Sequence, residues 1–128
     1  MDIRFARPTD RLDQVVAFYR DGLGLPVIGG FQDHTGYDGV FLDLPGTGAH
    51  LEFTTHADGS PCPAPTLDNL LVLYLDDAAG PVEYAERLRE FGAEPVEPEN
   101  PYWLSAGALT FEDPDGWRVV IAPPPEQA

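Results

Sequence analysis

His50 and Glu52 are the two residues of this chain whose types and spacing could most directly do chemistry. They lie in the segment 48–55, which alternates like a β-strand and follows a turn rich in proline and glycine at 45–48. Side chains two positions apart on a strand point to the same face, so His50, Glu52 and Thr54 should lie together. An imidazole beside a carboxylate can act as a general acid and base, or can supply half of a metal site. The same pattern also describes the solvated polar face of an antiparallel sheet, and both interpretations stay open.

The charge of the chain narrows the choice of partners. Of its 128 residues, 22 are acidic and 7 are basic, which gives a formal net charge of −15. A surface this acidic argues against nucleic acid and anionic membranes as partners, because both require a basic surface. The N-terminal residues show no apolar signal core, and no stretch approaches the length of a membrane helix, so we expect a soluble cytoplasmic protein. Cys62 is the single cysteine, which excludes an intrachain disulfide.

The order of the predicted elements indicates an internal repeat. The first half reads as a strand, a helix and three strands, and after a connection rich in proline the second half repeats that order. We therefore expect an α+β fold of two βαβββ repeats whose sheets form a cupped mixed β-sheet. The predicted boundaries are a first repeat at 1–56, a linker at 57–67, a second repeat at 68–123 and a loose tail at 124–128.

Particular residues set the ends of the predicted elements. In the first half, strands are predicted at 3–7, 27–31, 40–44 and 48–55, with a turn at 34–39 and a helix capped by Thr9 or Asp10 that ends at Gly22 or Gly24. In the second half, we expect a helix capped by Asp76 or Asp77 and ended by Gly92, an extended piece from Pro95, and a hairpin whose turn is 113–116. The apolar run 69–75 lacks alternation, which predicts a strand buried on both sides.

Two motifs then resemble a known superfamily. The segment Phe18–Leu25, FYRDGLGL, looks like the end of the first helix in the vicinal oxygen chelate superfamily, and Phe111–Gly116, FEDPDG, is similar to the motif near its C-terminal end. That superfamily includes glyoxalase I, bleomycin-resistance proteins, fosfomycin-resistance enzymes and extradiol dioxygenases. The resemblance covers nearly the whole chain and implies the glyoxalase/bleomycin-resistance fold, although this fold carries many chemistries.

The resemblance also implies where a metal would be bound. The metal enzymes of the superfamily use one ligand from each of four strands, and here those positions fall on Arg4, Glu52, Leu70 and Val120. Only Glu52 can coordinate a divalent cation, so we expect no metal and no other cofactor. An Arg4–Glu52 ion pair is the expected substitute for the metal.

The remaining candidates would line the cup. The predicted ligand-binding residues are those on or near the expected strands and connections that carry polar or aromatic groups: Arg4, His34, Tyr37, His50, Glu52, Asn69, Tyr102 and Trp103. The aromatic pair Tyr102–Trp103 fits either a pocket wall or the packing of a long connection, and Trp117 fits core or edge packing better than ligand contact.

Two function hypotheses follow. The first is a metal-free protein that binds a small organic molecule in the cup, as the resemblance to bleomycin-resistance proteins implies. The second is an enzyme, such as a glyoxalase-like lyase or isomerase, in which His50 and Glu52 act as acid and base or join His34 in a displaced metal site. Whether the protein is an enzyme stays open at this point. The resemblance and the small size of the cup also predict a homodimer.

Overall fold

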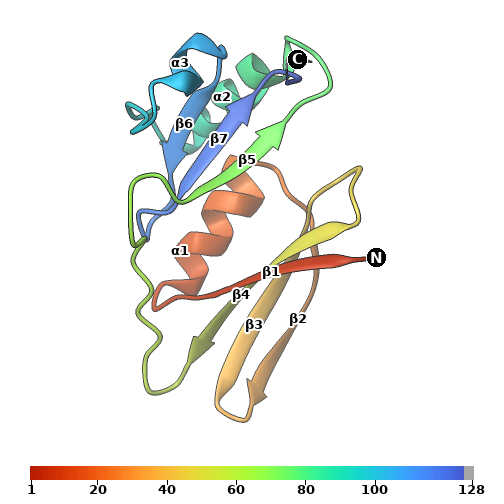
Figure 1. Cartoon of the computed structure of the whole chain (residues 1–128). Helices are drawn as coiled ribbons and strands as arrows, with labels where there is room; N and C mark the ends of the chain where they lie inside the picture. The colour runs from red at the N-terminus through yellow and green to blue at the C-terminus, as the bar shows by residue number, and fades with distance from the viewer. Residues whose placement is uncertain (126–128) are drawn as a thin grey trace. The chain divides into compact units, whose positions relative to one another are not determined.

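The computed structural model describes residues 1–125 and divides the chain into two compact units. The first runs from Met1 to Cys62 and the second begins at Pro63. Figure 1 shows the helices and strands of both units. The last three residues of the expected tail lie outside the described part of the chain.

The first unit contains one helix and a four-stranded mixed sheet, called sheet 1 here. Its elements are β1 (Ile3–Pro8), α1 (Leu12–Ala17), a π-helical turn η1 (Phe18–Gly22), β2 (Val27–His34), β3 (Tyr37–Asp43) and β4 (Ala49–His56). The strand order is β1-β4-β3-β2, in which β1 runs parallel to β4 and the other neighbours are antiparallel. This is the predicted strand–helix–three-strand order.

The helix of the first unit covers one face of sheet 1. Val15, Tyr19 and Leu23 are buried, as their helical spacing predicts, and the Tyr19 ring lies 4.8 Å from the ring of Phe53 on β4. The predicted cap is wrong in detail, because Arg11 is the N-cap residue and makes no side-chain cap. Thr9 lies two positions before the N-cap residue, and its hydroxyl accepts a hydrogen bond from the Arg11 N–H at 2.9 Å.

The turn predicted at 34–39 is much shorter in the structure. His34 and Tyr37 are paired across β2 and β3, and only Thr35 and Gly36 lie between the strands. Both of these residues have positive φ angles, 51° and 88°, which suit a two-residue hairpin turn. His34 and Tyr37 therefore sit on strands instead of in a loop.

The second unit contains a three-stranded mixed sheet, called sheet 2, and two helices. Its elements are β5 (Leu70–Tyr74), α2 (Gly80–Phe91), α3 (Tyr102–Ser105), β6 (Leu109–Glu112) and β7 (Arg118–Ala122), with the strand order β5-β7-β6. The extended piece predicted from Pro95 is reduced to one bridge between Val96 and Thr110. This segment contains Pro95, Pro98 and Pro101. Because proline has no backbone N–H to donate to a neighbouring strand, the segment does not form a regular strand. Tyr102 and Trp103, which were expected on a connection, form a helical turn.

The end of α2 follows the sequence signal, because Gly92 ends the helix with a φ of 111°. The predicted cap at Asp76 or Asp77 is wrong, because Ala79 is the N-cap residue and no side chain caps the helix. Asp77 lies two positions before Ala79, and its side chain accepts hydrogen bonds from the N–H groups of Ala79 and Gly80.

The burial of β5 also differs from the prediction. The predicted strand buried on both sides is wrong for β5, which is mostly half-buried. It lies at the edge of sheet 2, while the central strand β7 is buried throughout.

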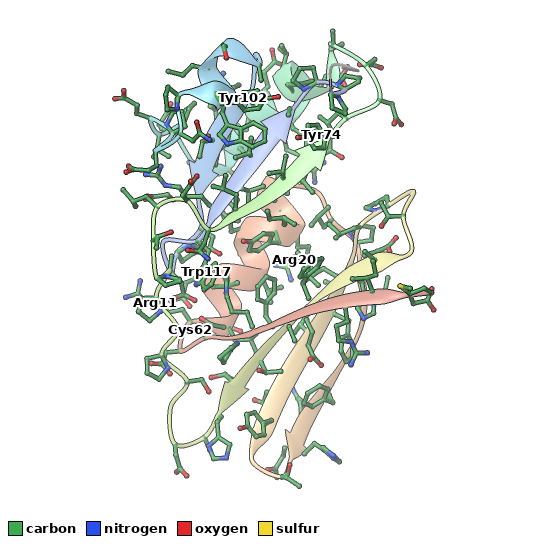
Figure 2. The ribbon with its side chains drawn as sticks, in the orientation of Figure 1. Arg11, Arg20, Cys62, Tyr74, Tyr102 and Trp117 are labelled. Atoms are coloured by element: carbon green, nitrogen blue, oxygen red, sulfur yellow. The ribbon has the colours of Figure 1, made fainter. Side chains whose placement is uncertain are left out.

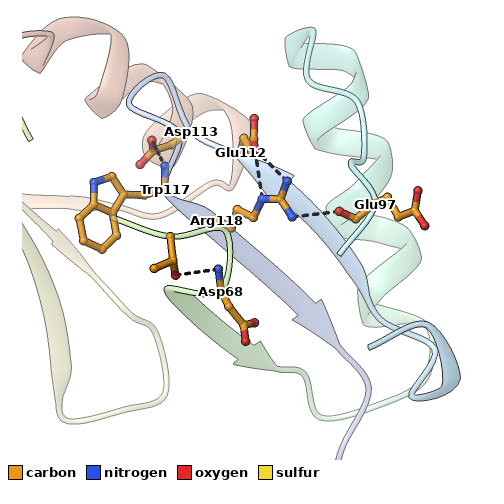
Figure 3. Close-up of polar contacts among 7 residues, drawn as sticks. Asp68, Glu97, Glu112, Asp113, Trp117 and Arg118 are labelled. Carbon is orange, nitrogen blue, oxygen red and sulfur yellow. Dashed lines mark hydrogen bonds and ion pairs between the residues drawn. The ribbon is translucent and has the colours of Figure 1, made fainter. Parts of the chain in front are cut away.

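A turn and a buried arginine organise the end of the second unit (Figure 3). The predicted hairpin turn at 113–116 is present, and Asp113 accepts hydrogen bonds from the N–H groups of Asp115 and Trp117. Arg118 is only 7% exposed and donates from Nε and Nη2 to one oxygen of Glu112, at 3.1 and 3.0 Å. Its Nη1 donates a hydrogen bond to the backbone oxygen of Glu97 at 2.9 Å. This contact attaches the segment after Pro95, where a strand was expected, to β7.

Candidate functional site

The polar face of β4 is assembled by the pairing of three strands. Leu51 and Phe53 are buried on the helix side, so His50 and Glu52 point to the opposite face of sheet 1, where they are half-buried. The strand register places Arg4 of β1 beside His50, and Phe41 of β3 directly across from Glu52. The expectation that His50 and Glu52 share a face is therefore confirmed.

Arg4 is the centre of this cluster. Its Nε donates a hydrogen bond to His50 Nε2 at 2.9 Å, and its Nη1 lies 3.9 Å from Glu52 Oε2. Its guanidinium carbon lies 4.8 Å from the centre of the Phe41 ring. The expected Arg4–Glu52 ion pair is present, but the shorter contact of Arg4 is to His50.

The exposure of the two charged side chains differs strongly. The Glu52 side chain is 14% exposed and that of Arg4 is 51% exposed. A largely buried carboxylate needs a compensating charge, which Arg4 supplies from the solvent side. The cluster therefore presents guanidinium N–H groups, and not the carboxylate, to the surroundings.

The Arg4 contact also involves one ring nitrogen of His50. In the hydrogen bond from Arg4 Nε, His50 Nε2 is the acceptor and contributes its lone pair. The Nε2 lone pair is the one that a base or a metal ligand would use. In this arrangement Arg4 occupies it.

Aromatic rings continue the face from His50 across β3 and β2. The Phe41 ring lies 6.1 Å from the His50 ring and 5.9 Å from the Phe31 ring. Phe31 lies over Gly39, where an added Cβ would meet its ring at 2.4 Å. We call Arg4, Phe31, Phe41, His50 and Glu52 the sheet-1 face.

Sequence reasoning missed both phenylalanines of the sheet-1 face. The signal was present for Phe41, because its neighbour Leu42 on the same strand is buried on the helix side, and adjacent residues of a strand face opposite sides of the sheet. Phe31 gave no such signal, because irregular pairing shifts the register of β2 on both sides of it.

His34 and Tyr37 lie at the far end of the same sheet. The His34 ring packs edge-on against Phe31 at 6.2 Å, and the Tyr37 ring packs against His56 at 4.6 Å. His56 was not among the predicted site residues. Both predicted residues are exposed, and their contacts in the structure are aromatic.

The remaining predicted site residues belong to the second unit. Asn69 accepts a hydrogen bond from the Thr66 hydroxyl at 2.6 Å. Trp103 is 8% exposed and packs with Val120, Leu70 and other apolar residues, which is the core-packing interpretation of the aromatic pair. Its neighbour Tyr102 is 52% exposed and can be found on α3 in Figure 2.

The residues expected at the superfamily's metal positions do not fit a metal. Leu70 and Val120 lie in an apolar cluster and have no donor atoms, and the Arg4 guanidinium places a positive charge beside Glu52. Within residues 1–125, no group of three or more His, Cys, Asp and Glu side chains could hold a metal ion, and this covers the displaced site of His34, His50 and Glu52. The same residues contain no helix long and apolar enough to cross a bilayer.

Comparison with known proteins identifies two consecutive family domains in the chain. Residues 3–54 match the YycE-like N-terminal domain, and residues 68–123 match the YycE-like C-terminal domain. Protein YycE of Bacillus subtilis strain 168 is 50% identical over 119 residues, which covers 93% of this chain and 85% of that protein.

Solved structures are similar over nearly the whole chain. A crystal structure of a Bacillus subtilis YycE protein has a TM-score of 0.89 and 45% identity, and the match covers 99% of this chain and 91% of that one. Glyoxalase I of Leishmania major gives a TM-score of 0.71 at 18% identity, covering 94% and 84%. TnmS3, an antibiotic-binding protein from Streptomyces sp. CB03234, gives 0.68 at 21% identity, covering 98% and 96%. At such identities the last two matches show the fold alone.

Proposed function

Because the chain belongs to the YycE-like family of proteins with the glyoxalase/bleomycin-resistance fold, we propose that it binds a small organic molecule, without a metal, on the sheet-1 face. The observation that carries the proposal is the position of Arg4. Its guanidinium lies between His50, Glu52 and Phe41, beside the only one of the four metal positions that kept a ligand side chain. A ligand can then be held by hydrogen bonds and aromatic contact.

A distant relative supports the same class of function. TnmS3 is an antibiotic-binding protein with this fold. The proposal for the present chain goes no further than a small organic molecule, because fold alone does not transfer a ligand.

The test is a search for a bound molecule. Protein purified under mild conditions should carry a small organic molecule that native mass spectrometry detects, and Arg4→Gln should lose it. The matched control is Arg20→Gln, because Arg20 is also half exposed and ion-paired, with Asp21, on the helix side of the sheet. Retention of the molecule by Arg4→Gln, or its loss from the Arg20 variant as well, would contradict the proposed position.

The enzyme hypothesis is the alternative that the same preparation addresses. Using His50 as a base requires freeing its Nε2 from Arg4, so Arg4→Gln would then raise turnover of a substrate. Under the binding proposal, the co-purified molecule is released chemically unchanged from the wild-type protein. Conversion of that molecule on incubation, abolished by His50→Ala, would instead place the protein among the enzymes.

A further inference from the structure

The sheet-1 face combines a fixed donor with an aromatic surface, and this combination limits what it can bind. Resting on the proposed function, we infer that it takes a planar aromatic molecule that carries a neutral oxygen acceptor, as in an amide or ketone. The Arg4 guanidinium binds that oxygen, and Phe41 and Phe31 contact the ring.

The donor comes from the way Arg4 is held. Its Nε is used by His50, and its Nη1 lies at ion-pair distance from Glu52, so the orientation of the guanidinium is set from two sides. Half of the side chain is exposed, and Nη2 takes part in neither of these two contacts. Arginine offers donors and no acceptor, so the ligand atom that meets it must be an acceptor.

The aromatic part follows from the residues next to Arg4. Phe41 lies under the guanidinium, and Phe31 continues the surface across Gly39, which has no side chain to interrupt it. Aromatic rings in offset or edge-on contact at these separations stabilise one another beyond simple burial. A flat ring extending from the Arg4-bound oxygen over β3 would make such contacts with both phenylalanines.

The charge of the ligand is limited by Glu52 and Asp43. Glu52 already balances Arg4, and Asp43, which pairs across from His50, adds a second carboxylate to this side of the sheet. A ligand carboxylate on Arg4 would therefore meet a like charge a few ångströms away, inside a protein of net charge −15. A ligand cation would be repelled by Arg4 itself. A neutral acceptor avoids both costs.

The experiment compares 2-naphthamide, 2-naphthoate and 2-naphthylmethylamine, which share one ring system and differ in charge. Titrations followed by amide NMR locate each probe and give its Kd. We expect 2-naphthamide to bind most tightly, to shift the amides of residues 29–31, 39–41 and 50–52, and to weaken about tenfold in Arg4→Gln. Arg20→Gln should leave its Kd unchanged.

Glu52→Gln gives a sharper test, because it should shift the binding preference of the sheet-1 face from 2-naphthamide toward 2-naphthoate. Removing the balancing carboxylate leaves Arg4 uncompensated, so 2-naphthoate should tighten by about fivefold while 2-naphthamide changes little. Asp21→Asn removes one negative charge on the helix side and should change neither Kd. Circular dichroism and thermal unfolding verify that each variant is folded.

Three outcomes would overturn the inference. Tighter binding of 2-naphthoate or of the amine to the wild-type protein would show that the ligand class is wrong, although binding on the face would still support the proposed function. Equal effects of Glu52→Gln on the charged and neutral probes would remove the role of charge balance. If no probe shifts the sheet-1 amides, the ligand class is wrong, and the proposed function is then judged by its own co-purification result.

Discussion

Arg4 is the residue that the resemblance places at the first metal-ligand position of the superfamily, and its charge changes what the neighbouring side chains can do. It hydrogen-bonds the His50 nitrogen that would bind a metal and lies beside the one carboxylate that could do so. We therefore expect protein purified without a histidine tag to hold no stoichiometric metal and to show none in titrations with nickel, zinc and manganese. Stoichiometric metal that is lost in both Glu52→Gln and His50→Ala would contradict this.

The same reasoning predicts a gain of metal binding from one substitution. Arg4→His removes the positive charge and places a third donor next to His50 and Glu52, since residue 4 is paired with residue 50. Zinc binding should then become measurable and at least about tenfold tighter than in the wild-type protein, because such sites need three or four converging donors. Arg4→Gln is the control, which loses the charge without adding an imidazole. Equal zinc affinity in the two variants would show that Arg4 is not what excludes the metal.

At the scale of elements, Arg118 stabilises the segment around Glu97, which pairs with sheet 2 through one bridge at Val96. Its three hydrogen bonds join β7 to Glu112 on β6 and to the backbone of Glu97, next to the single bridge at Val96. Arg118→Met should lower the free energy of unfolding by about 1–3 kcal/mol, because it leaves Glu112 and a backbone carbonyl without their donor. Urea denaturation measures this loss.

A surface arginine of the same unit is the control for that measurement. Arg89 lies 3.9 Å from Glu94, and both side chains are exposed. Arg89→Met should change the free energy of unfolding by less than about 0.5 kcal/mol, as is usual for exposed ion pairs. Equal losses in the two variants would show that burial of Arg118 contributes nothing.

At the scale of the whole molecule, we predict a homodimer. Superfamily resemblance and the limited core that a chain of this size can bury both favour a shared interface. Light scattering coupled to size-exclusion chromatography should give twice the chain mass of 14.0 kDa at micromolar concentration. A mass of 14.0 kDa under these conditions would count against the dimer.

The sequence by itself determined the order of elements in the first unit, the long helix and the hairpin of the second, and the shared face of His50 and Glu52. These depend on local signals: helical spacing at Val15, Tyr19 and Leu23, the stop at Gly92, and alternation along β4. Such signals act within a few residues, so they can be read without knowing the neighbours in space.

Only the tertiary structure decided which residues meet on that face and which do not. Strand register placed Arg4 against His50 and Phe41 across from Glu52, and a register depends on pairing between segments far apart in the chain. Burial depends in the same way on a strand's place in its sheet, which is why β5 is half-buried at an edge although its sequence is uniformly apolar. Trp103 likewise became a core residue because residues 102–105, directly after Pro101, form a helical turn that packs Trp103 against apolar residues of sheet 2.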